Sequence, residues 1–234
     1  MARKNGNEPL LKVFLSYANE DKEIAAGIKR FLEYFGATAF LAHEDIEFGE
    51  EWEREIFSAL GSSHVLVAVL TSRAKESNYV NQEIGYALAR DILILPFKVE
   101  VDPFGFTSRI QAFKASYTYS RSGEREIDFE ASVRKVVEKI SQKEGLSALL
   151  RRGVVTSFAT SRSYQETQCK LSVLKKYTDL TEEEQLTILR AALSNAQVHK
   201  EWKMRDYLQE LITESPSLLN SRDRALLKAK ITAD

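Results

Sequence analysis

Two neighbouring stretches decide the fold: residues 65–70, Val-Leu-Val-Ala-Val-Leu, and residues 77–83, Ser-Asn-Tyr-Val-Asn-Gln-Glu. The first is short, apolar and rich in valine, which predicts a strand buried on both faces of a parallel sheet. The segment after such a strand lies at the carboxyl edge of the sheet, where open α/β folds bind ligands. If the second stretch is helical, Tyr79 and Glu83 share one face, one turn apart. We therefore expect an aromatic ring and a carboxylate on one wall of a cleft. The alternative is an ordinary helix with a half-buried tyrosine and a solvated glutamate.

Working outward, apolar runs alternate with amphipathic segments over residues 10–143. Further strands are predicted at residues 11–16, 37–41, 92–97 and 115–119, the last at an edge of the sheet. Helical periodicity predicts helices at residues 24–35, 52–60, 77–88 and 127–140, and Asn19 or Asp21 is expected to cap the first of them. This alternation predicts an α/β domain, a five-stranded parallel sheet covered by helices on both faces. Residues 1–9 precede it as an N-terminal tail.

The pattern changes after Gly145, and residues 144–234 are predicted to form a small all-helical extension. Helices are expected at residues 164–177, 181–193, 202–213 and 221–230. Thr181 and Glu184 form a capping box that opens the second of these helices. Residues 154–159 give only a weak pattern, which fits a strand or a loop.

Composition excludes several classes of function. The chain has 234 residues with a net charge of -1, which argues against general binding of nucleic acid or of a membrane surface. No apolar run is long enough to span a bilayer, and the N-terminus lacks the apolar core of a signal peptide. One cysteine, Cys169, excludes an internal disulfide and fits a reducing compartment, so we expect a cytoplasmic protein. The three histidines have no metal-binding spacing, so no metal is expected.

Three motifs occur in one order along the α/β part. They are residues 14–18 (Phe-Leu-Ser-Tyr-Ala), residues 45–52 (Asp-Ile-Glu-Phe-Gly-Glu-Glu-Trp) and residues 77–83. Together they resemble a TIR (Toll/interleukin-1 receptor) domain, nearest to the bacterial and archaeal members, over residues 10–143. The resemblance implies flavodoxin-like winding of the sheet. It also implies one of two functions, because some TIR domains only assemble signalling complexes, whereas others cleave the nicotinamide–ribose bond of NAD⁺ to give nicotinamide and ADP-ribose or a cyclic product.

The resemblance also assigns residues to these roles. Enzymatic members need a glutamate one turn after an aromatic residue, and Glu83 matches this catalytic position; the family more often has tryptophan where this chain has Tyr79. Bond cleavage gives the ribose oxocarbenium character, which a carboxylate stabilises. Substrate-binding positions implied by the resemblance are Ser16, Tyr17, Ala18, Glu47, Trp52 and Tyr79. No G-x-G-x-x-G follows the first strand, so NAD⁺ is expected as a substrate and no resident cofactor is expected.

The alternatives differ in what they require of the chain. An adaptor-type TIR domain would bind other TIR domains through the loop at residues 42–51, and Glu83 would be incidental. A receiver domain needs an aspartate at the end of the third strand, where this chain has Leu70 and Thr71. Nucleoside deoxyribosyltransferases share a related fold and a carboxylate, but the ordered motifs favour TIR. The resemblance further implies self-association, anti-phage defence and an effector protein that responds to the nucleotide product.

Overall fold

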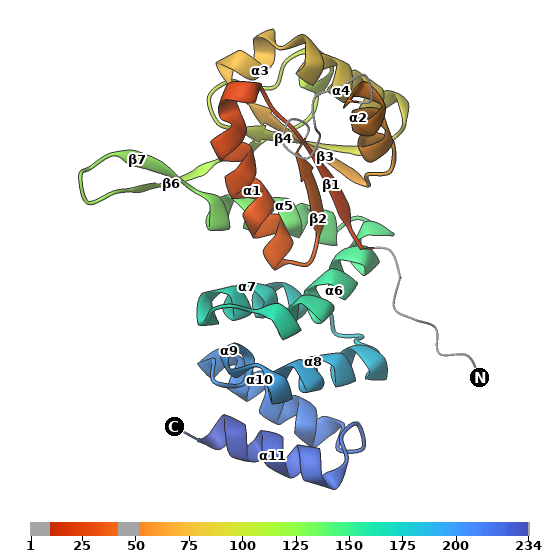
Figure 1. Ribbon diagram of the computed structural model, residues 1–234, viewed down its shortest axis with the longest axis vertical. Helices are drawn as coiled ribbons and strands as arrows, with labels where there is room; N and C mark the ends of the chain where they lie inside the picture. The colour runs from red at the N-terminus through yellow and green to blue at the C-terminus, as the bar shows by residue number, and fades with distance from the viewer. Residues whose placement is uncertain (1–9, 42–51, 234) are drawn as a thin grey trace. The chain divides into compact units, whose positions relative to one another are not determined.

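The computed structural model describes residues 10–41 and 52–233, and the chain divides into two compact units (Figure 1). The N-terminal unit comprises Met1–Glu33 and Ala37–Leu146, and the C-terminal unit comprises Tyr34–Gly36 and Ser147–Asp234. The first is α/β and the second is helical, as the change of pattern after Gly145 predicts.

A five-stranded parallel sheet forms the centre of the N-terminal unit. Its strand order is β2-β1-β3-β4-β5, and the strands are β1 (Lys12–Ser16), β2 (Thr38–Leu41), β3 (Val65–Leu70), β4 (Leu93–Lys98) and β5 (Phe113–Lys114). Every residue of β3 is buried, as the uninterrupted apolar run predicts for a central strand. The predicted five-stranded parallel sheet is confirmed.

Helices cover both faces of this sheet (Figure 1). They are η1 (Asn19–Asp21), α1 (Lys22–Tyr34), α2 (Trp52–Gly61), α3 (Ser72–Glu76), α4 (Asn78–Ala89), η2 (Gly105–Thr107) and α5 (Phe129–Ser141). Phe129 at the start of α5 packs on Gly27 of α1, so these two helices share a face. On the other face, Phe14 and Leu66 of the strands pack with residues of α2 and α4. Because side chains alternate along a strand, Ser16 is expected to face α4 as Phe14 does.

The predicted fifth strand is wrong in its position. Only Phe113–Lys114 joins the parallel sheet, as β5, whereas Ser116–Tyr119 forms β6 and pairs antiparallel with β7 (Arg125–Asp128). Where the chain leaves the sheet after β5, the backbone N–H of Ser116 donates to the Ser132 hydroxyl of α5 instead of to a neighbouring strand. Ile127, predicted to be in the last helix, therefore lies in β7.

The C-terminal unit consists of helices, as predicted. They are α6 (Leu146–Ser157), η3 (Phe158–Thr160), α7 (Tyr164–Leu174), α8 (Glu182–Ser194), α9 (Ala196–His199), α10 (Trp202–Glu214) and α11 (Ser221–Thr232). The capping box of Thr181 and Glu184 opens α8 as expected. The prediction of a strand or loop at residues 154–159 is wrong, because Val154 and Val155 are buried on α6 one turn after Leu150.

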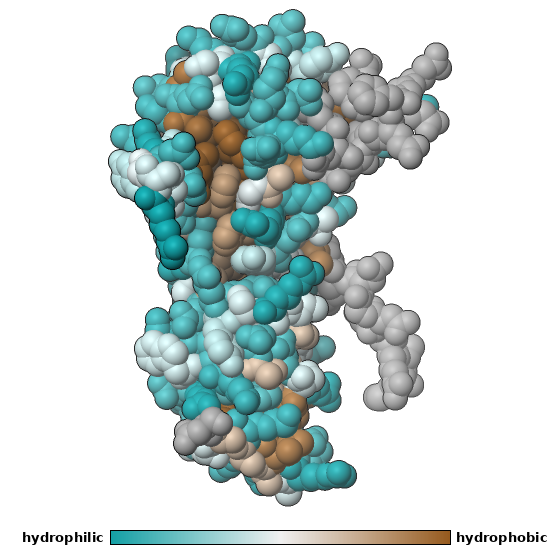
Figure 2. All heavy atoms as spheres, turned by 60° about the vertical axis from the view of Figure 1, so that its left-hand side comes forward, coloured by the Kyte–Doolittle hydropathy of each residue, from teal (hydrophilic) through white to brown (hydrophobic). Residues whose placement is uncertain are grey.

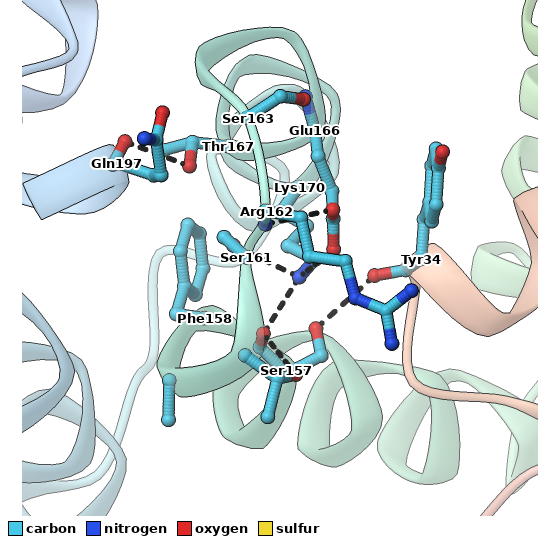
Figure 3. Close-up of polar contacts among 12 residues, drawn as sticks. Tyr34, Ser157, Phe158, Ser161, Arg162, Ser163, Glu166, Thr167, Lys170 and Gln197 are labelled. Carbon is cyan, nitrogen blue, oxygen red and sulfur yellow. Dashed lines mark hydrogen bonds and ion pairs between the residues drawn. The ribbon is translucent and has the colours of Figure 1, made fainter. Parts of the chain in front are cut away.

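A buried charge holds part of this unit together (Figure 3). The ammonium group of Lys170 donates to the carbonyl oxygen of Ser157 (2.6 Å), the hydroxyl of Ser161 (2.9 Å) and Oε1 of Glu166 (2.7 Å). Its three protons thus each have an acceptor. Oε2 of Glu166 accepts from the backbone N–H of Arg162 (3.0 Å). The network joins the end of α6 to the first turns of α7.

Candidate functional site

Helix α4 places Glu83 in the interior. The Ser77 hydroxyl accepts from the backbone N–H of Val80 (3.3 Å) and caps the helix, so the predicted helix start is confirmed. The buried positions of α4 are Val80, Glu83, Ile84 and Ala87, an i, i+3, i+4, i+7 stripe that faces the sheet. Glu83 therefore occupies a position that an apolar side chain would normally fill, and only 4% of its surface is exposed.

The Glu83 carboxylate meets the end of the central sheet. Ser16 is the last residue of β1, fully buried, and its hydroxyl donates a 2.5 Å hydrogen bond to Oε2 of Glu83. The other carboxylate oxygen, Oε1, is buried and has no hydrogen-bond partner among residues 10–41 and 52–233. A buried acceptor without a donor costs free energy, so Oε1 is an oxygen to which a ligand hydroxyl can bind favourably.

The environment of Glu83 changes its acidity. Burial raises the pKa of Glu83 to about 7, and the hydrogen bond from Ser16 opposes this rise. The cause is desolvation, because a carboxylate loses its hydration when apolar residues surround it. A carboxyl group with such a pKa changes its charge near neutral pH, which is typical of groups that stabilise or transfer charge in catalysis.

The other predicted site residues occupy different environments. Tyr17 and Ala18 continue from Ser16 into the buried edge of the sheet, whereas Tyr79 exposes 50% of its surface. Tyr79 and Glu83 thus share helix α4 but not the same degree of burial. Glu47 lies outside the described residues, and Trp52 begins α2 with a side chain that is not described.

A second polar group at this edge was not expected from the sequence. Asp21 is buried, and its carboxylate accepts from the Thr71 hydroxyl (2.5 Å) and from the Arg73 guanidinium (2.9 Å). The Thr71 hydroxyl in turn accepts from the backbone N–H of Ala74 and caps α3. The expectation that Asn19 or Asp21 caps the first helix is wrong. Ala18 precedes η1 without a side-chain cap, and the Asp21 carboxylate instead links η1 to Thr71 and Arg73, which follow β3.

We expect Asp21→Ala to lower the free energy of unfolding of the N-terminal unit by about 2–3 kcal/mol, because it removes two hydrogen bonds to a buried carboxylate. Urea unfolding followed by circular dichroism measures this change. Asp102→Ala is the matched control, since Asp102 is a largely exposed aspartate whose ion pair with Lys98 lies at the surface. Equal effects of the two substitutions would show that the Asp21 contacts do not stabilise the unit.

Apolar side chains also reach the surface of the N-terminal unit. Figure 2 shows them gathered in a hollow on the face that it draws. Over the whole described surface of this unit, the large hydrophobic residues that are exposed are Leu10, Phe57, Tyr79, Leu88, Phe106 and Tyr119.

The described residues contain neither a metal cluster nor a membrane span. No group of three or more histidine, cysteine, aspartate or glutamate side chains in residues 10–41 and 52–233 is arranged to hold a metal ion. Within the same ranges, no helix has both the length and the apolar character needed to cross a bilayer.

A comparison with known protein families identifies the family of this chain. The chain matches the family model of the TIR domain over residues 13–153, more than half of its length. It is similar to the crystal structure of the TIR domain of the Toll-related receptor TRR-2 from Hydra magnipapillata, with 21% identity, 44% of this chain and 82% of that chain covered, and a TM-score of 0.39. It is also similar to the TIR domains of the activated Roq1 resistosome that directly recognises the pathogen effector XopQ, with 19% identity, 71% and 98% covered, and a TM-score of 0.37. No curated protein matches the chain.

Proposed function

Because this chain belongs to the TIR domain family, we propose that it cleaves the nicotinamide–ribose bond of NAD⁺. The observation that carries the proposal is the carboxylate of Glu83, which takes an inward position on α4 and keeps Oε1 without a partner in the described residues. A side chain that costs stability in a core position is expected where function requires it. Glu83 is the proposed catalytic residue, and NAD⁺ is the proposed substrate.

The reaction suits a single carboxylate. The C1′–N bond breaks with its electron pair leaving on nicotinamide, which departs neutral and needs no general acid. Positive charge then develops on the ribose, and the ionised Glu83 stabilises it across a site of low polarity. Water adds to C1′ and loses one proton, giving ADP-ribose and nicotinamide; an adenine nitrogen that adds in place of water gives a cyclic product.

The two carboxylate oxygens have different proposed roles. Oε2 is occupied by the Ser16 hydroxyl, so Oε1 is proposed to accept a hydrogen bond from a ribose hydroxyl. The half-exposed ring of Tyr79 is proposed to lie against the substrate. Tyr17, Ala18, Glu47 and Trp52 keep the substrate-binding roles that the family resemblance implies.

We further propose that the enzyme works as an assembly. Phe57, Leu88 and Phe106 are exposed apolar residues that a second copy would cover. Nicotinamide release per chain is expected to rise several-fold with protein concentration, because contacts between copies complete the site. Chromatography of reactions over a wide range of protein concentrations measures this, and an activity per chain that stays constant would contradict the proposal.

A non-catalytic adaptor is the second candidate function. The same exposed residues favour it, because they suit a surface that binds other TIR domains whether or not chemistry follows. A parent protein that is inert on NAD⁺ both dilute and concentrated, yet self-associates, would support the adaptor.

For the catalytic protein, we propose that the nucleotide product acts in the cytoplasm as an anti-phage defence signal to a separate effector protein.

A further inference from the structure

Both the sheet and the Glu83 carboxylate hold Ser16 in place. It pairs with Ala68 of β3 in the parallel ladder, at the end of a strand that lies between two neighbours. Its side chain is fully buried, and its hydroxyl donates to Oε2 of Glu83 across 67 residues of sequence.

We propose that Ser16 is a positioning residue, whose hydroxyl holds the carboxylate of Glu83 in one orientation and keeps it ionised while apolar neighbours surround it. This rests on the proposed function. It replaces the substrate-binding role expected for Ser16, because the single proton of the hydroxyl is donated to Oε2 and none remains for the substrate. Oε1 is thereby the carboxylate oxygen left to the substrate.

Among the described groups around Glu83, the Ser16 hydroxyl is the one that opposes the effect of burial on the pKa of Glu83. Val80, Ile84 and Ala87 flank it on α4, and Phe14 and Leu66 of the strands belong to the same apolar cluster. Burial raises the pKa of Glu83 and the Ser16 hydrogen bond lowers it, and no charged side chain of the described residues is a further cause. At the same sheet edge, the charges of Asp21 and Arg73 form an ion pair with each other. The tyrosines nearest in sequence to Ser16 and Glu83 are Tyr17 and Tyr79.

The test measures the titration of Glu83 without requiring activity. Full-length protein labelled with ¹³C at the glutamate side-chain carboxyl is titrated by NMR, and Glu83→Gln identifies the resonance. Ser16→Ala is expected to move the Glu83 titration to higher pH, and Ser16→Cys, which keeps the size and has a weak donor, is expected to lie between Ser16→Ala and the parent. Circular dichroism confirms that each variant is folded. An unchanged titration in folded Ser16→Ala would overturn the proposal.

Kinetics with NAD⁺ then separate positioning from substrate contact. If Ser16 positions Glu83, Ser16→Ala leaves KM unchanged and lowers kcat at pH 7. The loss is roughly fivefold when the Glu83 titration midpoint moves from about 7 to one pH unit higher, because the ionised fraction at pH 7 then falls from about one half to about one eleventh. The lost activity is expected to return as the pH is raised. A raised KM with an unshifted pH profile would instead assign Ser16 to substrate binding and overturn the inference. If the parent does not cleave NAD⁺, only the proposed function is refuted. The NMR titration still decides whether the Ser16 hydroxyl keeps Glu83 ionised.

Discussion

Glu83→Gln is expected to reduce NAD⁺ cleavage by about 10²-fold or more while making the protein more stable at pH 8. The loss of activity follows because glutamine keeps the shape of the side chain but lacks the negative charge that stabilises the ribose cation. The gain in stability follows because removing an ionised carboxylate from water costs more free energy than removing a neutral amide.

The sign of the effect on stability is fixed by the pKa of Glu83. Folding raises this pKa from 4.5 to about 7, so the folded state holds the proton more tightly than the unfolded chain does. The stabilisation from the proton is complete below pH 4.5 and is lost as the pH rises to 7, a change of about 3 kcal/mol. Glu83→Gln is therefore expected to have a higher free energy of unfolding than the parent at pH 8, and this difference is expected to be small at pH 4.5.

Urea unfolding at these two pH values measures this difference. Glu76→Gln is the matched control, because Glu76 is an exposed glutamate on the neighbouring helix α3. It is expected to change neither activity nor the pH dependence of stability. A Glu83→Gln protein that is equally destabilised at both pH values would show that Glu83 is held as a structural anion, with its charge compensated in the fold.

Lys170→Ala is expected to lower the free energy of unfolding of the C-terminal unit by about 3–5 kcal/mol. The substitution leaves the Glu166 carboxylate buried without its cation, and it removes the donor to Ser157 and Ser161. Faster amide hydrogen exchange in α6 and α7 would report the change directly. Exchange in the central strand β3 is expected to stay unchanged, which makes it the internal control.

A double substitution separates the charge from the packing. Lys170→Met with Glu166→Leu replaces the buried pair by apolar groups of similar size, so it leaves no uncompensated charge. The double variant is therefore expected to be more stable than Lys170→Ala, although it changes two residues. If the double variant is the less stable of the two, the ion pair contributes net stability that apolar packing cannot replace.

The sequence predicts those parts of the fold that depend on residues close together along the chain. The run at residues 65–70 forms the buried centre of the sheet, and Ser77 caps the helix that carries Glu83. The contacts at the site join residues that are far apart in sequence, 67 positions for Ser16 and Glu83 and 50 for Asp21 and Thr71. Periodicity and capping patterns cannot predict such pairs, because these patterns involve only neighbouring residues and the pairs form only when the whole domain folds.

The errors have the same origin. Residues 116–119 have the composition of a strand, but the choice of partner is tertiary, and they pair with β7 instead of joining the sheet. Residues 154–159 are rich in β-branched side chains, yet Val154 and Val155 are helical because α6 buries them. The sequence likewise does not predict the burial of Glu83, since a glutamate one turn from Tyr79 fits a solvated helix face equally well.

Product release from NAD⁺ by parent protein and by Glu83→Gln, side by side at high protein concentration, tests the central claim most directly. Chromatography is expected to show one nicotinamide for each NAD⁺ consumed by the parent, together with ADP-ribose or a cyclic product, and almost none from the variant. Equal release by both proteins, or none by the parent at any concentration, would contradict a catalytic role for the buried carboxylate.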